Sequence, residues 1–175
     1  MKTLTLILLL TMTLLAQTPP PKPDPGLTMI GMGDTFTDAQ GDRLLMMAFH
    51  TKYQENVVGM YFTSADGSEV RYYMNAAAWD TMKQTLIKCR DTWDTLTPDS
   101  FKTWPAVTGY RIANRVAVIR YSLMGATAIG GKQMLISAEG GPAREIRVSI
   151  NLKQNDLKSL VDEFTTIDGF FRGGK

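Results

Sequence analysis

The chain has 175 residues, of which 44% are hydrophobic and 21% are charged, and its formal net charge is +2. This balance lacks the basic excess that is typical of phosphate-binding domains. A single cysteine excludes an intrachain disulfide and an all-cysteine zinc site, and a single histidine excludes the two or three histidine ligands that are common in zinc hydrolases.

The charges are unevenly divided along the chain. Residues 17–100 hold 7 bases and 11 acids, whereas residues 101–175 hold 11 bases and 6 acids. Three explanations stay open: the two halves attract each other across an internal interface, one basic face meets an acidic partner, or the surface charge has drifted between duplicated halves.

Residues 1–16 are predicted to form a secretory signal peptide. Lys2 precedes an apolar run that ends at the small residue Ala16, and the run is shorter than the roughly 20 residues of a membrane span. Cleavage after Ala16 would export the protein, either to a periplasm or to the medium. The alternative is an uncleaved N-terminus that holds the domain close to a membrane, because Leu14 is larger than the side chain preferred at that position.

Residues 17–26 are predicted to be a proline-rich spacer. Five prolines in this stretch fix φ and remove backbone donors, so the stretch favours neither a helix nor a central strand. The folded part is then expected to be a single α+β domain over residues 27–175.

This domain is predicted to consist of two repeats, at about residues 27–96 and 106–171. The segment 69–75 reads Glu-x-Arg-x-x-x-Asn, and so does the segment 145–151. A helical stripe behind each segment also matches, with Trp79, Met82, Leu86, Cys89 and Trp93 corresponding to Leu157, Leu160, Phe164, Ile167 and Phe171. Because the offset between such landmarks only increases along the chain, we infer a tandem duplication.

In the first repeat, strands are predicted at residues 29–36, 43–51, 57–63 and 69–75 from alternation and from β-branched and aromatic content. The strand at 43–51 is apolar on both faces, which predicts that both faces are covered. Asn75 is expected to cap a helix that begins at Ala76.

In the second repeat, strands are predicted at residues 106–112, 115–123, 132–138 and 144–151, and a helix at 153–171, with residues 97–105 as the link between the repeats. The predicted fold class is therefore α+β: a duplicated antiparallel meander of three or four strands, each followed by one helix, with the helices packed on one face of the sheet.

With four strands in each unit, this plan resembles in topology the PUR and Whirly proteins. The resemblance implies binding of single-stranded nucleic acid, with Arg43, Arg115, Arg120 and Tyr73 as contact residues. Export and the near-neutral charge argue against nucleic acid as the partner.

The Glu-x-Arg strands supply the candidate ligand-binding residues. Alternation places Glu69, Arg71 and Tyr73 on one face of the first strand, and Glu145 and Arg147 are their counterparts in the second. These residues form either a binding site or a ladder of salt bridges. An exposed aromatic patch is expected from Tyr73 together with two further candidates, Trp104 and Tyr110.

No catalytic residue, cofactor or metal site is predicted. His50 lies within a strand and is expected to be structural; Asp34, Asp38 and Asp42 have the wrong spacing for a calcium loop, and Gly31-Met32-Gly33 lacks the rest of a dinucleotide fingerprint. We therefore expect an exported, non-catalytic module that binds a protein, a peptide or a small ligand. The alternatives are the nucleic-acid-binding protein described above and an enzyme in which Glu69 and Glu145 perform carboxylate-based chemistry.

Overall fold

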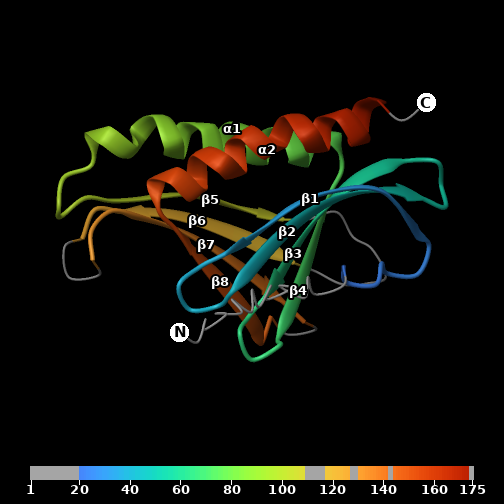
Figure 1. Cartoon of the computed structure of the whole chain (residues 1–175), viewed down its shortest axis with the longest axis horizontal. Helices are drawn as coiled ribbons and strands as arrows, with labels where there is room; N and C mark the ends of the chain where they lie inside the picture. Colours follow the sequence, from blue (N-terminus) through green and yellow to red (C-terminus); the bar gives the residue numbers. More distant parts are fainter. Residues whose placement is uncertain (1–19, 109–116, 127–129, 142–143, 174–175) are drawn as a thin grey trace, which may run out of the picture.

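A computed structural model describes residues 20–108, 117–126, 130–141 and 144–173, and it confirms the predicted fold class (Figure 1). Sheet A contains β1 to β4 and sheet B contains β5 to β8, both antiparallel and both in chain order. The elements are β1 (Leu27–Thr37), β2 (Arg43–Thr51), β3 (Asn56–Thr63), β4 (Glu69–Met74), α1 (Ala76–Thr92), the 3₁₀ helix η1 (Trp93–Thr95), β5 (Phe101–Thr108), β6 (Val118–Met124), β7 (Gln133–Gly140), β8 (Ile146–Leu152) and α2 (Gln154–Gly173). In the described part of the chain, no helix combines the length and apolarity needed to cross a membrane.

The predicted elements of the first repeat agree with this structure, including the helix start. Asn75 accepts a hydrogen bond from the Ala78 N–H at 3.0 Å and so caps α1. In the second repeat, β5 begins at Phe101 and not at residue 106, because Phe101 pairs with Met124 of β6. The predicted link is therefore shorter than expected, and residues 109–112 of the predicted strand lie outside the described residues.

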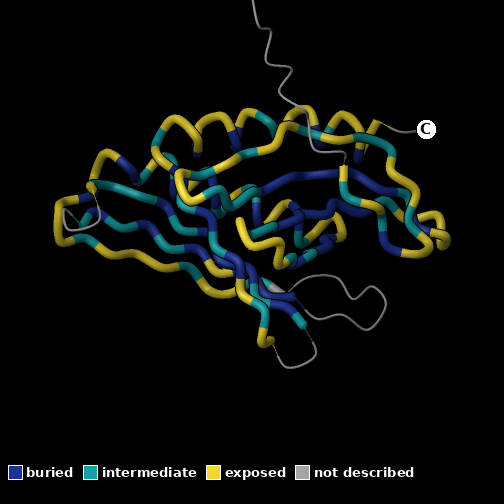
Figure 2. Tube along the Cα trace, turned by 60° about the horizontal axis from the view of Figure 1, so that its bottom comes forward, coloured by how far each residue is buried: buried dark blue, intermediate teal, exposed yellow. Residues whose placement is uncertain are grey.

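One hydrophobic core holds both repeats together. It contains the inner faces of both sheets and all ten residues of the two helical stripes. Both helices cover the same side of the sheets, and their outward sides are exposed (Figure 2). Because the duplicated units share a core, they form one domain.

Each helix packs against both repeats, and α2 lies mainly against the repeat that precedes it. The helix α2 follows sheet B in the chain, yet it lies against β1, β2 and β3 of sheet A. The helix α1 follows sheet A and reaches β5 of sheet B as well as β3 and β4. The two Glu-x-Arg strands, β4 and β8, also contact each other. Neither sheet is therefore covered by its own helix alone.

Two glycines in β1 allow α2 to approach this edge strand closely. A Cβ atom at Gly31 would lie 2.0 Å from Cγ of Phe170, and one at Gly33 would lie 2.5 Å from Oε1 of Glu163. The strand register shifts at the same place, between Met29 and Gly31. The Gly-x-Gly sequence thus serves helix packing on a bulged strand.

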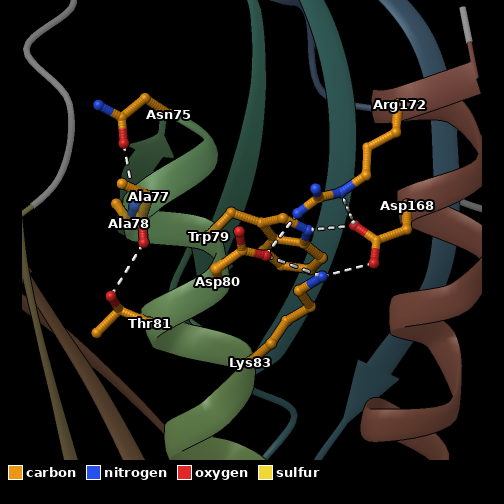
Figure 3. Close-up of polar contacts among 9 residues, drawn as sticks. All are labelled: Asn75, Ala77, Ala78, Trp79, Asp80, Thr81, Lys83, Asp168 and Arg172. Atoms are coloured by element: carbon orange, nitrogen blue, oxygen red, sulfur yellow. Dashed lines mark hydrogen bonds and ion pairs between the residues drawn. The ribbon is translucent and has the colours of Figure 1, made fainter.

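A polar cluster joins α1 to α2 (Figure 3). The indole Nε1 of Trp79 donates to Oδ1 of Asp168 at 2.6 Å, and Nζ of Lys83 donates to Oδ2 at 2.5 Å. Arg172 bridges Asp168 and Asp80, with Nη2 2.5 Å from Oδ1 of Asp80. Since the start of α1 meets the end of α2 and Asp94 meets Gln154 at the other end, the helices are antiparallel.

The pKa of Asp168 is lowered. Burial would raise it, but the bonds from Lys83 and Trp79 and the charge of Lys83 outweigh burial. A carboxylate with a lowered pKa in the folded state stabilises the protein above its unfolded pKa, and this contribution is lost as the pH falls through the folded pKa.

We therefore expect Asp168→Asn to lower the free energy of unfolding at pH 7 by about 1 to 2 kcal/mol. The variant should also lose less stability than the wild type when the pH is lowered from about 5 to about 2. Urea unfolding at several pH values measures both effects. Asp162→Asn, at an exposed position of the same helix, is the control. Equal acid sensitivity of Asp168→Asn and wild type would contradict this prediction.

Candidate functional site

The face of sheet A that points away from the helices carries a second apolar cluster, which we call the outer face. Every member is at most 8% exposed, and Leu27 packs against them: Leu45, Met47, Phe49, Val57, Tyr61 and Tyr73. A sheet face opposite to the helices would ordinarily be polar if water covered it. The outer face of sheet A is therefore shielded from water within the chain itself.

The corresponding face of sheet B is polar, although it belongs to a copy of the same unit. Ser149 stands where Tyr73 stands in the first repeat, and its hydroxyl bonds to Ser137 at 2.8 Å. Arg120 is exposed on this face and donates to Glu139 at 3.2 Å. The comparison between the copies shows that large apolar side chains on the outer face are particular to sheet A.

Three aromatic rings lie at the centre of the outer face. The ring centroids of Phe49, Tyr61 and Tyr73 are 5.9 to 6.0 Å apart in each pair, and two of the pairs are edge-to-face. Gly59 lies between them, where an added Cβ would be 2.8 Å from Phe49 and 3.1 Å from Tyr73. The glycine therefore lets the rings close over the sheet.

Residues 20–26, which we call the strap, cross this face before β1 begins (Figure 1). The carboxylate of Asp24 is 4% exposed. Its Oδ2 accepts a hydrogen bond from the Tyr73 hydroxyl at 2.9 Å, and its Oδ1 accepts one from Nη1 of Arg71 at 2.7 Å. The Tyr61 and Tyr73 hydroxyls are 2.7 Å apart, and Tyr61 is the donor because Tyr73 donates to Asp24.

Arg71 connects the strap to the rings. Its guanidinium lies 5.0 Å from the centroid of the Tyr61 ring, pairs with Glu69 and also donates to the carbonyl oxygen of Lys22 at 3.0 Å. The cation therefore bonds both to the side chain of Asp24 and to the backbone of the strap.

The surroundings of Tyr61, Tyr73 and Arg71 keep each side chain in the protonation state that its hydrogen bonds require. Burial and the neighbouring Asp24 raise the pKa of both Tyr61 and Tyr73, so both hydroxyls stay protonated and can donate. Burial would lower the pKa of Arg71, but Glu69 and Asp24 raise it. Arg71 therefore remains a cation at physiological pH.

The structure brings three of the five predicted site residues together, namely Glu69, Arg71 and Tyr73. The other two belong to sheet B: Arg147 is 3.4 Å from the Ser137 hydroxyl, and Glu145 is exposed just before β8. The two Glu-x-Arg faces thus differ in their surroundings.

The expected exposed aromatic patch is not found at two of its three positions, and the third lies outside the described residues. Tyr73 is 3% exposed because the strap lies over it, and Trp104 packs against the core. Tyr110 belongs to the undescribed part. Asp24, Phe49 and Tyr61 were missed as site residues, although the apolar character of residues 43–51 on both faces indicated a covered outer face.

His50 lies away from this cluster and links two elements. Its Nδ1 donates to Oδ1 of Asn56 at 2.8 Å, while Nδ2 of Asn56 donates to the Phe171 carbonyl oxygen at 2.7 Å. His50 borders an open pocket of about 490 Å³ beside the start of α1. His50 pairs with Asn56 and Glu69 pairs with Thr63, so the two residues lie beside opposite ends of β3, and their backbone positions are about 23 Å apart along the strand.

The enzyme alternative requires His50 or Glu145 to converge with Glu69, and the strand register separates His50 from Glu69. Within the ranges that the structure describes, no group of three or more His, Cys, Asp or Glu residues is arranged to hold a metal ion. The sequence matches no protein-family model, and no curated protein is significantly similar to it.

If the Tyr73 hydroxyl holds Asp24, then Tyr73→Phe should lower the free energy of unfolding by about 1 to 3 kcal/mol, because a buried carboxylate loses a donor. In an Asp24→Ala background the same change should have a much smaller effect. Urea unfolding of the four chains of this double-mutant cycle measures the coupling. Tyr53→Phe, at a position that is 71% exposed, is the control. Additive effects of the two changes would contradict the contact.

Proposed function

We propose that the protein is an exported, non-catalytic binding module and that its binding surface is the outer face of sheet A. The observation that carries the proposal is the pairing of three aromatic rings and a fixed cation on a sheet face that is polar in the other repeat. Aromatic side chains and arginine are the residue types that contribute most to binding sites.

The way in which the face is covered also supports this proposal. The residues of the face come from β2, β3 and β4 and are held by the strand ladders. The strap that covers part of it has no regular secondary structure from residue 20 to residue 24. A rigid surface under an irregular segment is suited to binding, since the surface does not have to form when a ligand arrives.

The export part of the proposal rests on the N-terminal sequence, in which Lys2 precedes an apolar run that ends at Ala16. In an exported protein, cleavage after Ala16 would leave the strap and Asp24 in the mature chain. The binding surface would thus be complete after cleavage.

The proposal is tested with a phage-displayed library of random peptides, selected on the full chain and on its Asp24→Asn variant. We expect to recover peptides whose affinity falls at least tenfold when Arg71 is changed to Gln. Arg90→Gln, which alters a partly exposed arginine on α1, should leave their affinity unchanged. Peptides whose affinity does not depend on Arg71, or a selection that recovers no peptide, would overturn the proposed site.

Export is tested separately. In a bacterial host, the intact mass of the protein found outside the cytoplasm should correspond to a chain without residues 1–16.

A second candidate function is the binding of single-stranded nucleic acid by sheet B. It is favoured by the duplicated ββββα topology, which resembles that of the PUR and Whirly proteins, and by the exposed Arg120 and Arg147 on the polar face. Fluorescence anisotropy of a labelled, unstructured oligothymidine of 20 nucleotides measures such binding. Binding through phosphates should weaken steeply between 50 and 200 mM salt and should fall in Arg120→Ala. No binding at 50 mM salt would exclude this candidate.

A further inference from the structure

The strap occupies the outer face of sheet A in the manner of a bound peptide. Residues 20–24 have no regular secondary structure, and the chain then turns at Pro25 and Gly26, where the Leu27 N–H donates to the Asp24 carbonyl oxygen at 3.1 Å. It gives the face one buried anion, Asp24, and one backbone acceptor, the carbonyl oxygen of Lys22. Arginine side chains on a binding surface recognise acidic peptides through contacts of this kind.

Two donors from sheet A, Arg71 and Tyr73, are arranged around the two carboxylate oxygens of Asp24. Tyr73 donates to one oxygen and Arg71 donates to the other. Tyr61 supports both donors, because its hydroxyl donates to Tyr73 and its ring lies under Arg71. This arrangement is specific for a carboxylate: an amide in its place would put an N–H group against at least one of the donors.

The prolines on either side of Asp24 contribute to the fit. Pro23 and Pro25 fix the backbone on both sides of the carboxylate, so little conformational entropy is lost when such a segment binds. A peptide with Asp between two prolines is therefore the ligand type that the site is shaped to accept.

We propose that the Arg71, Tyr73 and Tyr61 site binds, in trans, a proline-rich peptide with an aspartate between two prolines, and that Asp24 is its resident competitor in the unliganded protein. This inference rests on the proposed function and names the ligand class of the same surface. The strap is tethered next to its site, so its effective concentration is of millimolar order. A free peptide therefore competes poorly against the intact strap and binds well once the Asp24 carboxylate has been removed.

The test uses the full chain and a fluorescent peptide that copies residues 18–27. Anisotropy titrations compare the wild type with Asp24→Ala and with Asp24→Asn, which keeps the shape of the side chain. We expect the peptide to bind the Asp24 variants at least tenfold more tightly than the wild type. The same peptide with Asn in place of Asp24 should bind at least tenfold more weakly than the parent peptide.

Matched variants identify the site. In the Asp24→Ala background, Arg71→Gln should abolish binding of the peptide, and Arg90→Gln should leave it unchanged. Circular dichroism shows whether each chain is folded. Folded Asp24 variants that do not bind the peptide at millimolar concentration would overturn the inference, as would equal binding of the Asp and Asn peptides. Loss of the fold in both Asp24 variants would also overturn the inference, because the binding site must stay folded when the Asp24 carboxylate is absent.

The outcomes separate this inference from the proposed function. If random-library peptides without an acidic residue bind in an Arg71-dependent way while the residue 18–27 peptide does not, the binding surface stands and the ligand class is wrong. If neither kind of peptide binds, both are wrong.

Discussion

The hydrogen bond from Trp79 to Asp168 lies at the point where the two repeats depend on each other. It joins α1 to α2, and each of these helices covers strands of the repeat to which it does not belong. Such an exchange makes the shared core cooperative, because unfolding either repeat exposes the inner face of both sheets. The polar cluster between α1 and α2 holds the two helices together. The faces of the sheets that point away from the helices have no such structural role, so the two repeats can differ there.

The faces of sheets A and B that point away from the helices differ in polarity. Duplication began with two equivalent faces, yet one now has Tyr73 and the other Ser149 at the matching position of the Glu-x-Arg strand. The polar face needs no cover, whereas burial of the aromatic face contributes several kcal/mol only when something covers it. The uneven charge of the two halves is not explained by the helix contact, since Lys83 pairs with Asp168 while Arg172 pairs with Asp80, one base from each half.

Most of the fold could be predicted from the sequence because alternation and helical spacing are local properties. The bounds of β2 and the start of α1 are examples, and the cap of α1 is predicted from Asn75 alone. The exchange of helices could not be predicted, because an apolar stripe indicates that a helix is covered but not by which sheet. The start of β5 was missed since its pairing with β6, and not the composition around Pro105, decides it. The burial of Asp24 depends on Arg71 and Tyr73, which are 47 and 49 residues away in the chain.

The proline-rich composition of residues 17–26 predicts an extended chain, and an extended chain has two uses that composition does not distinguish. It separates a domain from its anchor when it makes no contacts, and it acts as an intramolecular ligand when one of its side chains is buried. When Asp24 leaves the face, water hydrates its carboxylate, but Arg71 and Tyr73 lose an acceptor on a face that is otherwise apolar. Under the proposal, a ligand carboxylate in the place of Asp24 would give both donors an acceptor again, whereas a neutral ligand would leave Arg71 without this anion.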